Sequence, residues 1–163
     1  MLLLATAVPV LALAVASFVN LPKKLIYNGS QSAPIGFYWI DRKRVLAGDY
    51  ALVCVPDRVR ELVEERRYLP PKVPLLKRVV GLSGDTICRL DNQVLINGKA
   101  IATALKRDQS DRILADWRGC HILSVDLIFF LQDHPQSFDG RYFGPVDRAL
   151  IVGRATRLRY PWR

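Results

Sequence analysis

Short apolar runs separated by turn residues constrain most of this chain to antiparallel β-structure. In the run 94–101, Val-Leu-Ile-Asn-Gly-Lys-Ala-Ile, the pair Asn97-Gly98 predicts a two-residue type I′ turn between two strands. Similar short strands are predicted over residues 37–40, 50–55, 75–80, 126–131 and 149–158. The chain shows no heptads, internal repeats or parallel-sheet alternation. We therefore expect a mainly β fold with coiled, antiparallel strands.

One or two short helices complete the expected fold. Residues 57–67 predict an amphipathic helix, in which Val59, Leu62 and Val63 form an apolar stripe. Asp57 is a candidate N-cap for this helix. The prolines that follow indicate an extended connector into the next strand.

The N-terminus differs from the rest of the chain in composition. Residues 2–19 carry no charge and consist mostly of Leu, Ala and Val, which is about the minimum length for a membrane-spanning helix. We predict a hydrophobic helix over 1–21 that serves as a transmembrane anchor, with a cleaved secretory signal as the alternative. Residues 22–163 then form one extracytoplasmic domain. Lys23 and Lys24 favour the opposite topology by the positive-inside rule, but that rule is weak before a long translocated domain.

The charge and the cysteines narrow the functional classes. The formal net charge is +9, but the Lys and Arg residues are scattered and not interleaved with aromatic residues, so we expect no nucleic-acid partner. The three cysteines form no CxxC pair, which argues against a zinc site. Outside the cytoplasm, one disulfide is natural, and we expect it between Cys88 and Cys120. We expect Cys54 to be reduced and buried, because it lies in the apolar run 51–55.

Two distant segments offer a serine and a lysine suited to one active site. Ser32 lies in the glycine- and proline-containing stretch 28–38, which indicates a turn that presents a side chain. Lys77 lies in a predicted apolar strand, between Leu75 and Val79 on its own face. A base must remove the proton of a serine hydroxyl, and burial lowers the pKa of a lysine by up to about 3–5 units. Together they predict a Ser/Lys hydrolase, although each alone is more simply a surface serine and a strand-edge lysine.

A third segment, residues 133–144, alternates Ser137, Asp139 and Arg141 in a glycine-rich loop. Its simplest interpretation is an Asp–Arg pair that braces the loop. A Ser-His-Asp triad of Ser32 with Asp139 is the alternative, but both histidines are poorly placed for it. One lies in the proline-containing loop itself, and the other directly follows a cysteine.

In this order, the three segments resemble the type I signal peptidase family. That family carries Ser-x-Ser before a proline, then Lys-Arg-x-x-Gly-x-x-Gly-Asp on a strand, and then Ser-x-Asp-x-Arg in a late loop. The corresponding residues here are Ser30-Gln-Ser32-Ala-Pro34, Lys77-Arg78-Val-Val-Gly81-Leu-Ser-Gly84-Asp85 and Ser137-Phe-Asp139-Gly-Arg141. The resemblance covers nearly the whole chain. It implies the signal peptidase fold, a coiled, antiparallel, barrel-like β-sheet, behind one N-terminal hydrophobic helix.

Three departures from the housekeeping enzymes resemble the TraF branch of that family. Ala33 replaces the usual methionine, Pro34 comes one residue early, and the domain lacks the large insertion of many bacterial members. The TraF branch serves conjugative plasmid transfer and matures the pilus subunit. The resemblance therefore implies a membrane-associated serine endopeptidase that matures a pilin precursor, with cyclisation of the product as an alternative to hydrolysis.

The resemblance also implies a role for each site residue. Ser32 is the expected nucleophile and Lys77 its general base, and the Ser30 hydroxyl and the Ser32 backbone N–H form the expected oxyanion hole. Asp139 is the expected third catalytic residue, or else it fixes the loop. Supporting roles fall to three further residues, Ser137, Arg141 and Arg78.

The implied setting is the bacterial inner membrane with a periplasmic catalytic domain, or the periplasm if the N-terminal segment is cleaved. The expected partners are a pilin precursor, the inner membrane and components of a conjugation or type IV secretion channel. No cofactor and no metal are implied. Two alternatives stay open, namely a general type I signal peptidase for exported proteins and a non-catalytic periplasmic assembly factor of a conjugation channel.

Overall fold

The computed structural model describes residues 24–159 and contains, within them, eleven strands, two short α-helices and one 3-10 turn. The strands are β1 (Leu25–Asn28), β2 (Gly36–Asp41), β3 (Tyr50–Val53), β4 (Leu75–Gly81), β5 (Thr86–Leu90), β6 (Gln93–Ile96), β7 (Lys99–Thr103), β8 (Gly119–Ile122), β9 (Leu127–Leu131), β10 (Val146–Asp147) and β11 (Ile151–Arg157). The helices are α2 (Asp57–Glu65) and α3 (Gly140–Phe143), and the 3-10 turn is Arg148–Leu150. The predicted helix 1–21 and its boundary with 22–163 lie outside the described residues. No helix among residues 24–159 is long and apolar enough to cross a membrane.

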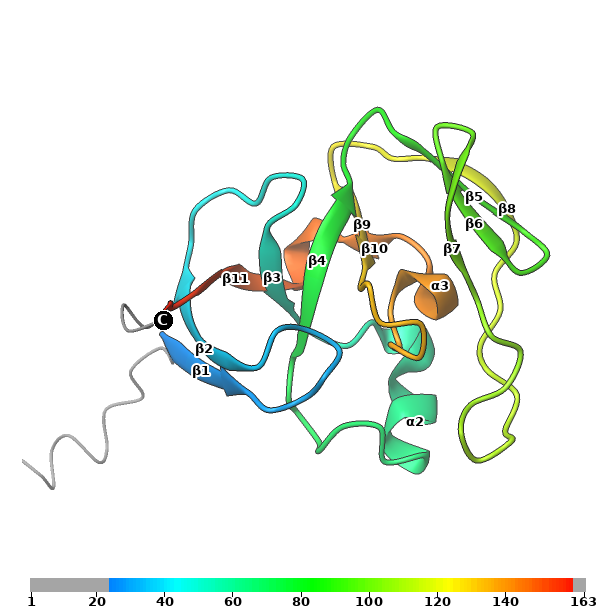
Figure 1. The fold of residues 1–163 in the computed structure, drawn as a ribbon. Helices are drawn as coiled ribbons and strands as arrows, with labels where there is room; N and C mark the ends of the chain where they lie inside the picture. The colour runs from blue at the N-terminus through cyan, green and yellow to red at the C-terminus, as the bar shows by residue number, and fades with distance from the viewer. Residues whose placement is uncertain (1–23, 160–163) are drawn as a thin grey trace, which may run out of the picture.

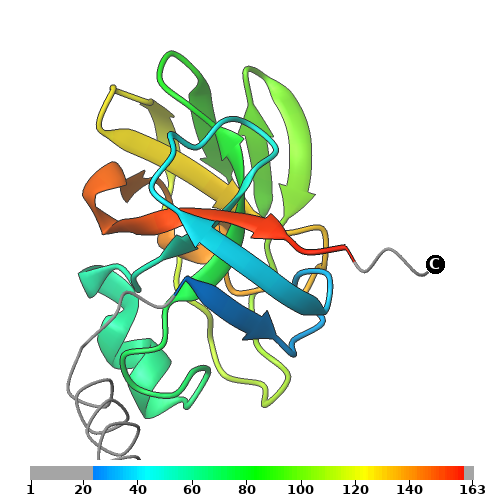
Figure 2. The same cartoon turned by 90° about the vertical axis from the view of Figure 1, so that its left-hand side faces the viewer.

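The strands form two antiparallel sheets (Figure 1). The larger sheet has seven strands in the order β1-β2-β11-β3-β4-β9-β10, and the smaller has four in the order β7-β6-β5-β8. The smaller sheet lies beyond β4 and β9, while α2 lies at the opposite end of the molecule, as Figures 1 and 2 show. The predicted class is confirmed, because the fold is mainly β and antiparallel with two short helices.

Strand β4 runs through the middle of the larger sheet and is buried on both faces. Leu75 and Val79 pack into the largest hydrophobic cluster, together with residues of β9 and α2. Leu76 packs into a second cluster, formed with residues of β2, β3 and β11. A strand covered on both sides reads as a nearly continuous apolar run. A lysine at position 77 therefore has little access to water.

Helix α2 forms where the apolar stripe predicts it, and its ends differ from the prediction. Val59 and Val63 are buried against the sheet. The N-cap is Pro56 in an extended conformation, so the prediction of Asp57 as N-cap is wrong. Asp57 instead lies in the first turn and forms an ion pair with Arg60. The helix ends at Glu65, two residues before the predicted end.

The expectation of a buried Cys54 is wrong, since this free cysteine is exposed. Strand β3 pairs with β4 and β11 only as far as Val53, two residues short of the predicted end. Cys54 therefore lies past the covered part of the sheet. Strand β11 likewise begins at Ile151 rather than 149, because the Asp147 carboxylate accepts from the Ala149 N–H and caps a 3-10 turn there.

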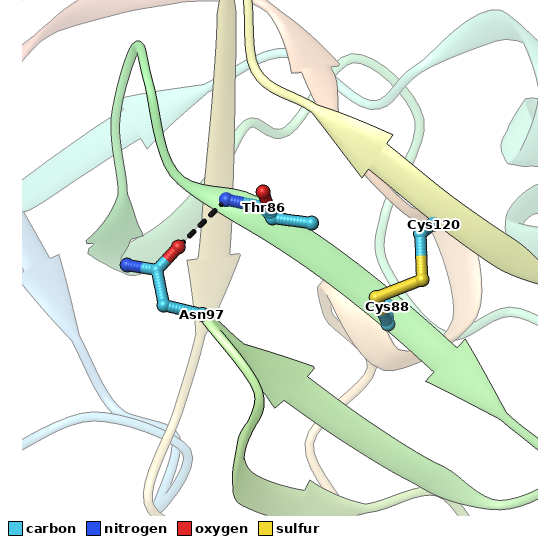
Figure 3. The surroundings of a disulfide bond; sticks show 4 residues. All are labelled: Thr86, Cys88, Asn97 and Cys120. Atoms are coloured by element: carbon cyan, nitrogen blue, oxygen red, sulfur yellow. Dashed lines mark hydrogen bonds between the residues drawn. A yellow bond between two sulfur atoms is a disulfide. The ribbon is translucent and has the colours of Figure 1, made fainter.

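The smaller sheet contains the predicted hairpin and a disulfide. Asn97 and Gly98 both have positive φ angles, as a type I′ turn requires, and they join β6 to β7. The Asn97 side chain also accepts a hydrogen bond from the backbone N–H of Thr86, at 2.8 Å (Figure 3). Cys88 and Cys120 lie directly opposite each other on β5 and β8 and form a disulfide. The disulfide holds β5 to β8, and the Asn97 hydrogen bond holds β5 to the β6–β7 hairpin.

Candidate active site

The turn that carries Ser32 joins β1 to β2 and is held from two sides. The Asn28 amide nitrogen donates to three backbone carbonyl oxygens of the turn, those of Ser30 and Ala33 at 3.0 Å and Pro34 at 3.3 Å. The Tyr38 hydroxyl, fully buried beneath the turn, donates to the Pro34 carbonyl at 2.7 Å. Ala33 is buried in the core, which leaves the neighbouring Ser32 half-buried at the surface. The sequence therefore places the serine on an anchored turn rather than a loose loop.

Two hydroxyl groups lie side by side on this turn. The oxygens of Ser30 and Ser32 are 2.8 Å apart and hydrogen-bonded. Ser30 also donates its hydroxyl proton to Asn28 Oδ1, at 2.9 Å. A hydroxyl has a single proton to donate. Ser32 is consequently the donor in the bond between the two serines.

Lys77 is buried in β4, with 4% of its surface exposed. Its ammonium donates to the hydroxyl oxygen of Ser137 at 2.9 Å. Burial lowers the pKa of Lys77 to about 8, while the carboxylate of Asp139 raises this pKa and the guanidinium of Arg141 lowers it. A lysine with such a pKa is neutral in a useful fraction of molecules near neutral pH and can then accept a proton.

Asp139 and Arg141 form a buried ion pair behind the lysine. Both side chains are at most 3% exposed, and the Asp139 oxygens accept from Arg141 Nε at 2.9 Å and from a terminal nitrogen at 2.8 Å. Asp139 also accepts from the backbone N–H groups of Gln132 and Arg141. Arg141 donates in addition to the carbonyls of three loop residues, Gln132, His134 and Pro135. The pair thus braces the loop that presents Ser137, and its hydrogen bonds leave Asp139 without one to Lys77.

Arg78, the next residue along β4, points away from this group. Its guanidinium pairs with the exposed Asp133, and the side chain is about one third exposed. Gln132 covers the strand edge instead, because its side-chain nitrogen donates to the Leu76 carbonyl at 2.8 Å. Arg78 therefore tethers the loop 132–141 to β4 from the outside.

Ser30, Ser32, Lys77 and Ser137 line one open cavity of about 960 Å³. Its walls are mainly apolar and come from several elements. They include Ile26 of β1, Leu52 of β3, Leu75 and Leu76 of β4, Phe138 before α3 and Tyr142 within α3. No direct hydrogen bond joins Ser32 to Lys77 among the described residues. An apolar cavity with a few convergent polar groups is the usual form of a substrate site.

The structure thus brings together four of the predicted site residues and separates the others. Asp139 and Arg141 lie behind the lysine, Arg78 outside it, and the cysteines in the smaller sheet. Asn28 and Tyr38 were not predicted as site residues from the sequence. The sequence signal for Asn28 was an asparagine at the start of a turn, where backbone carbonyls have no strand partner and need another donor. Within residues 24–159 no three His, Cys, Asp or Glu side chains gather in a way that could hold a metal ion.

Comparisons with known proteins give the family. A sequence model of the family described as signal peptidase, peptidase S26, matches residues 1–160. The chain belongs to this family of serine peptidases.

Similar proteins include plasmid transfer proteins and signal peptidases. Plasmid transfer protein TraF of Escherichia coli is 32% identical over 136 residues, which cover 77% of each chain. Signal peptidase I V of Bacillus subtilis (strain 168) is 37% identical over 95 residues, 52% of this chain and 56% of the relative. A crystal structure of a signal peptidase I from Enterococcus faecalis V583 superposes with a TM-score of 0.42 at 20% identity, covering 71% of this chain and 100% of that one.

Proposed function

We propose that this chain is a membrane-associated serine endopeptidase that matures a pilin precursor for conjugal transfer. The observation that carries the proposal is a buried lysine of lowered pKa that shares an apolar cavity with the Ser30–Ser32 hydroxyl pair. Membership of the S26 family supports the peptidase chemistry. The similarity to plasmid transfer protein TraF over 77% of both chains supports the conjugal setting.

The proposed reaction begins when the Ser32 hydroxyl turns its proton from Ser30 toward neutral Lys77, which takes it. The Ser32 oxygen attacks the scissile carbonyl carbon, and the resulting oxyanion accepts from the Ser32 N–H and the Ser30 hydroxyl. Lys77 then gives its proton to the leaving amine, and an acyl ester on Ser32 remains. Ser137 orients the lysine, and the ester is released by water or by an amine of the substrate. Water gives a linear product, and an internal amine gives a cyclic one that is lighter by one water.

The outer face of the β1–β2 hairpin supports an action at the membrane surface. Leu25 and Trp39 are directly paired, as are Tyr27 and Phe37, and all four side chains are 44–61% exposed on the same face. Aromatic residues of this kind are enriched where protein meets the headgroup region of a bilayer. We propose that this face rests on the inner membrane and holds the cavity near membrane-bound precursors, with the domain on the periplasmic side.

The test is cleavage of the pilin precursor by the full-length chain in bacterial membranes. Ser32→Ala, Lys77→Ala and Lys77→Arg should each abolish cleavage, because an alanine removes the group and an arginine stays protonated. The exposed Ser83→Ala and Lys43→Arg are matched controls that should cleave normally. Mass spectrometry of the product distinguishes the linear from the cyclic form.

Two other outcomes would replace the proposal. Cleavage of a broad panel of secretory precursors, with no preference for the pilin, would favour a general signal peptidase, a role that the Bacillus subtilis relative makes reasonable. Normal pilus assembly by Ser32→Ala and Lys77→Ala cells would favour a non-catalytic assembly factor.

A further inference from the structure

Asn28 contacts both the backbone of the serine turn and one of its two hydroxyl groups. Its amide nitrogen faces three carbonyl oxygens, which only accept hydrogen bonds. This fixes the orientation of the side-chain amide, because Oδ1 in that position would be repelled. Oδ1 therefore faces Ser30, where it accepts from the hydroxyl at 2.9 Å and from the backbone N–H at 3.3 Å.

The orientation of Asn28 decides how the two serine protons are arranged. With the Ser30 proton on Asn28, the Ser30 oxygen offers a lone pair to Ser32, and the Ser32 hydroxyl is the donor between them. The opposite arrangement, with Ser30 donating to Ser32, would occupy a lone pair on the oxygen that has to attack. Asn28 thus holds the Ser32 oxygen free of a donor before the reaction.

We propose that Asn28 is a positioning residue that acts through the Ser30 hydroxyl on the nucleophile Ser32. The inference rests on the proposed function, since it assigns a role within the same site. During attack the Ser30 proton turns from Asn28 Oδ1 to the developing oxyanion, where a bond to a charged acceptor is stronger than a bond to a neutral amide. Asn28 itself makes no bond to the reacting atoms.

The expected cost of Asn28→Ala is about 10-fold in kcat with little change in KM, because the Ser30 hydroxyl is then free to donate to Ser32, and that neutral hydrogen bond has to break before the Ser32 oxygen attacks. Asn28→Ala also loses the three hydrogen bonds to the turn carbonyls. If Asn28 had a purely structural role, the loss of these three bonds alone would lower kcat. A double-mutant cycle with Ser30→Ala separates the two effects. If Asn28 acts through the Ser30 hydroxyl, Asn28→Ala lowers kcat by a smaller factor in the Ser30→Ala background than in the wild-type background. We expect the two factors to differ by at least about 5-fold.

Tyr38→Phe provides a matched control on the same turn. It removes the hydrogen bond to the Pro34 carbonyl and touches neither serine hydroxyl. Its effect, whatever its size, should be the same with Ser30 and with Ser30→Ala. The free energy of unfolding of every variant is measured in urea, to show that the comparison is made between folded proteins.

The assay uses the full chain in detergent micelles and a fluorogenic peptide whose hydrophobic segment ends in Ala-x-Ala. If Ser30→Ala is too slow on the amide, the same cycle is run on an ester of that peptide, whose better leaving group speeds cleavage. An equal loss from Asn28→Ala in both backgrounds would overturn the inference. Undiminished cleavage by Ser32→Ala would instead overturn the proposed function, so the two failures are distinguishable.

Discussion

Replacing Lys77 with methionine should remove a specific part of the pH dependence of the free energy of unfolding. Methionine is unbranched and of similar length, so it can occupy the same buried position on β4 without a charge. The wild-type chain holds an ammonium group in a position with 4% exposure. Since burial disfavours the charged form, the folded state carries a cost that methionine lacks.

The magnitude follows from the pKa of Lys77. A fall from the ordinary value of 10.5 to about 8 corresponds to about 3 kcal/mol in the free energy of unfolding, at about 1.4 kcal/mol for each pKa unit. Below pH 8 the lysine is protonated in both states, so the full cost is present. Between pH 8 and 10.5 the unfolded chain retains a proton that the folded chain has released, and the wild type gains stability as the pH rises. Above 10.5 both states are neutral and the cost has disappeared.

The measurement is urea unfolding of both proteins from pH 7 to 10.5. The difference in free energy of unfolding, Lys77→Met minus wild type, should be about 3 kcal/mol larger at pH 7 than at pH 10.5. Loss of the bond to Ser137 adds an offset of about 1–3 kcal/mol that changes little with pH. Both proteins carry Cys54→Ser, because a free thiolate would attack the disulfide at high pH. The exposed Lys43→Met is the control, and a difference between Lys77→Met and wild type that stays constant with pH would refute the lowered pKa.

The remaining predictions concern the same group of residues. The cleavage rate should rise with pH and reach half its maximum near pH 8, because only neutral Lys77 accepts a proton; a pH profile of kcat/KM with a midpoint near 10 would contradict this. Asp139→Asn should move that midpoint to lower pH, because the carboxylate raises the pKa of Lys77; the pH profile of cleavage measures this effect. The same variant should be less stable by about 3–5 kcal/mol in urea unfolding, because Arg141 is left buried and unpaired. Gly140→Ala should cost about 1–3 kcal/mol in the same unfolding assay, because its Cβ would lie 2.4 Å from the Phe130 carbonyl oxygen and force the backbone to move; unchanged stability would mean that the loop accommodates it freely.

Much of the fold was accessible from local sequence signals. The Asn97-Gly98 pair predicted a hairpin, because a type I′ turn requires positive φ at both central positions and few residue types adopt it. Strand β4 and α2 were found because their apolar patterns are strong. Strands β5 and β8 were missed because neither contains a long apolar run: β5 buries only Ile87 and Arg89, and every residue of β8 is exposed. Register partners and a disulfide hold such a strand, and neither leaves a periodic pattern in the sequence.

The candidate site was only partly accessible in the same way. Lys77 stood out because a charged residue in an apolar strand is unusual. An Asp–Arg pair was the simplest interpretation of the alternating loop, but whether Asp139 is a third catalytic residue or only fixes the loop could not be read from the sequence. The structure places Arg141 against Asp139 through two side-chain bonds. Asn28 was missed because three of its contacts are with carbonyl oxygens, which every residue of a turn possesses, and its contact with the Ser30 hydroxyl leaves no pattern in the sequence.

The lowered pKa of Lys77 is a balance between burial and the ion pair behind it. An isolated buried carboxylate near the lysine would hold the ammonium charged and oppose its use as a base. The guanidinium of Arg141 offsets that effect, because it lowers the same pKa. The pair also fixes the loop that carries Ser137, whose hydroxyl accepts from the lysine. Asp139 and Arg141 are therefore needed together: removing Arg141 would leave a carboxylate that favours the charged lysine, and removing Asp139 would leave a buried cation and a loosened loop.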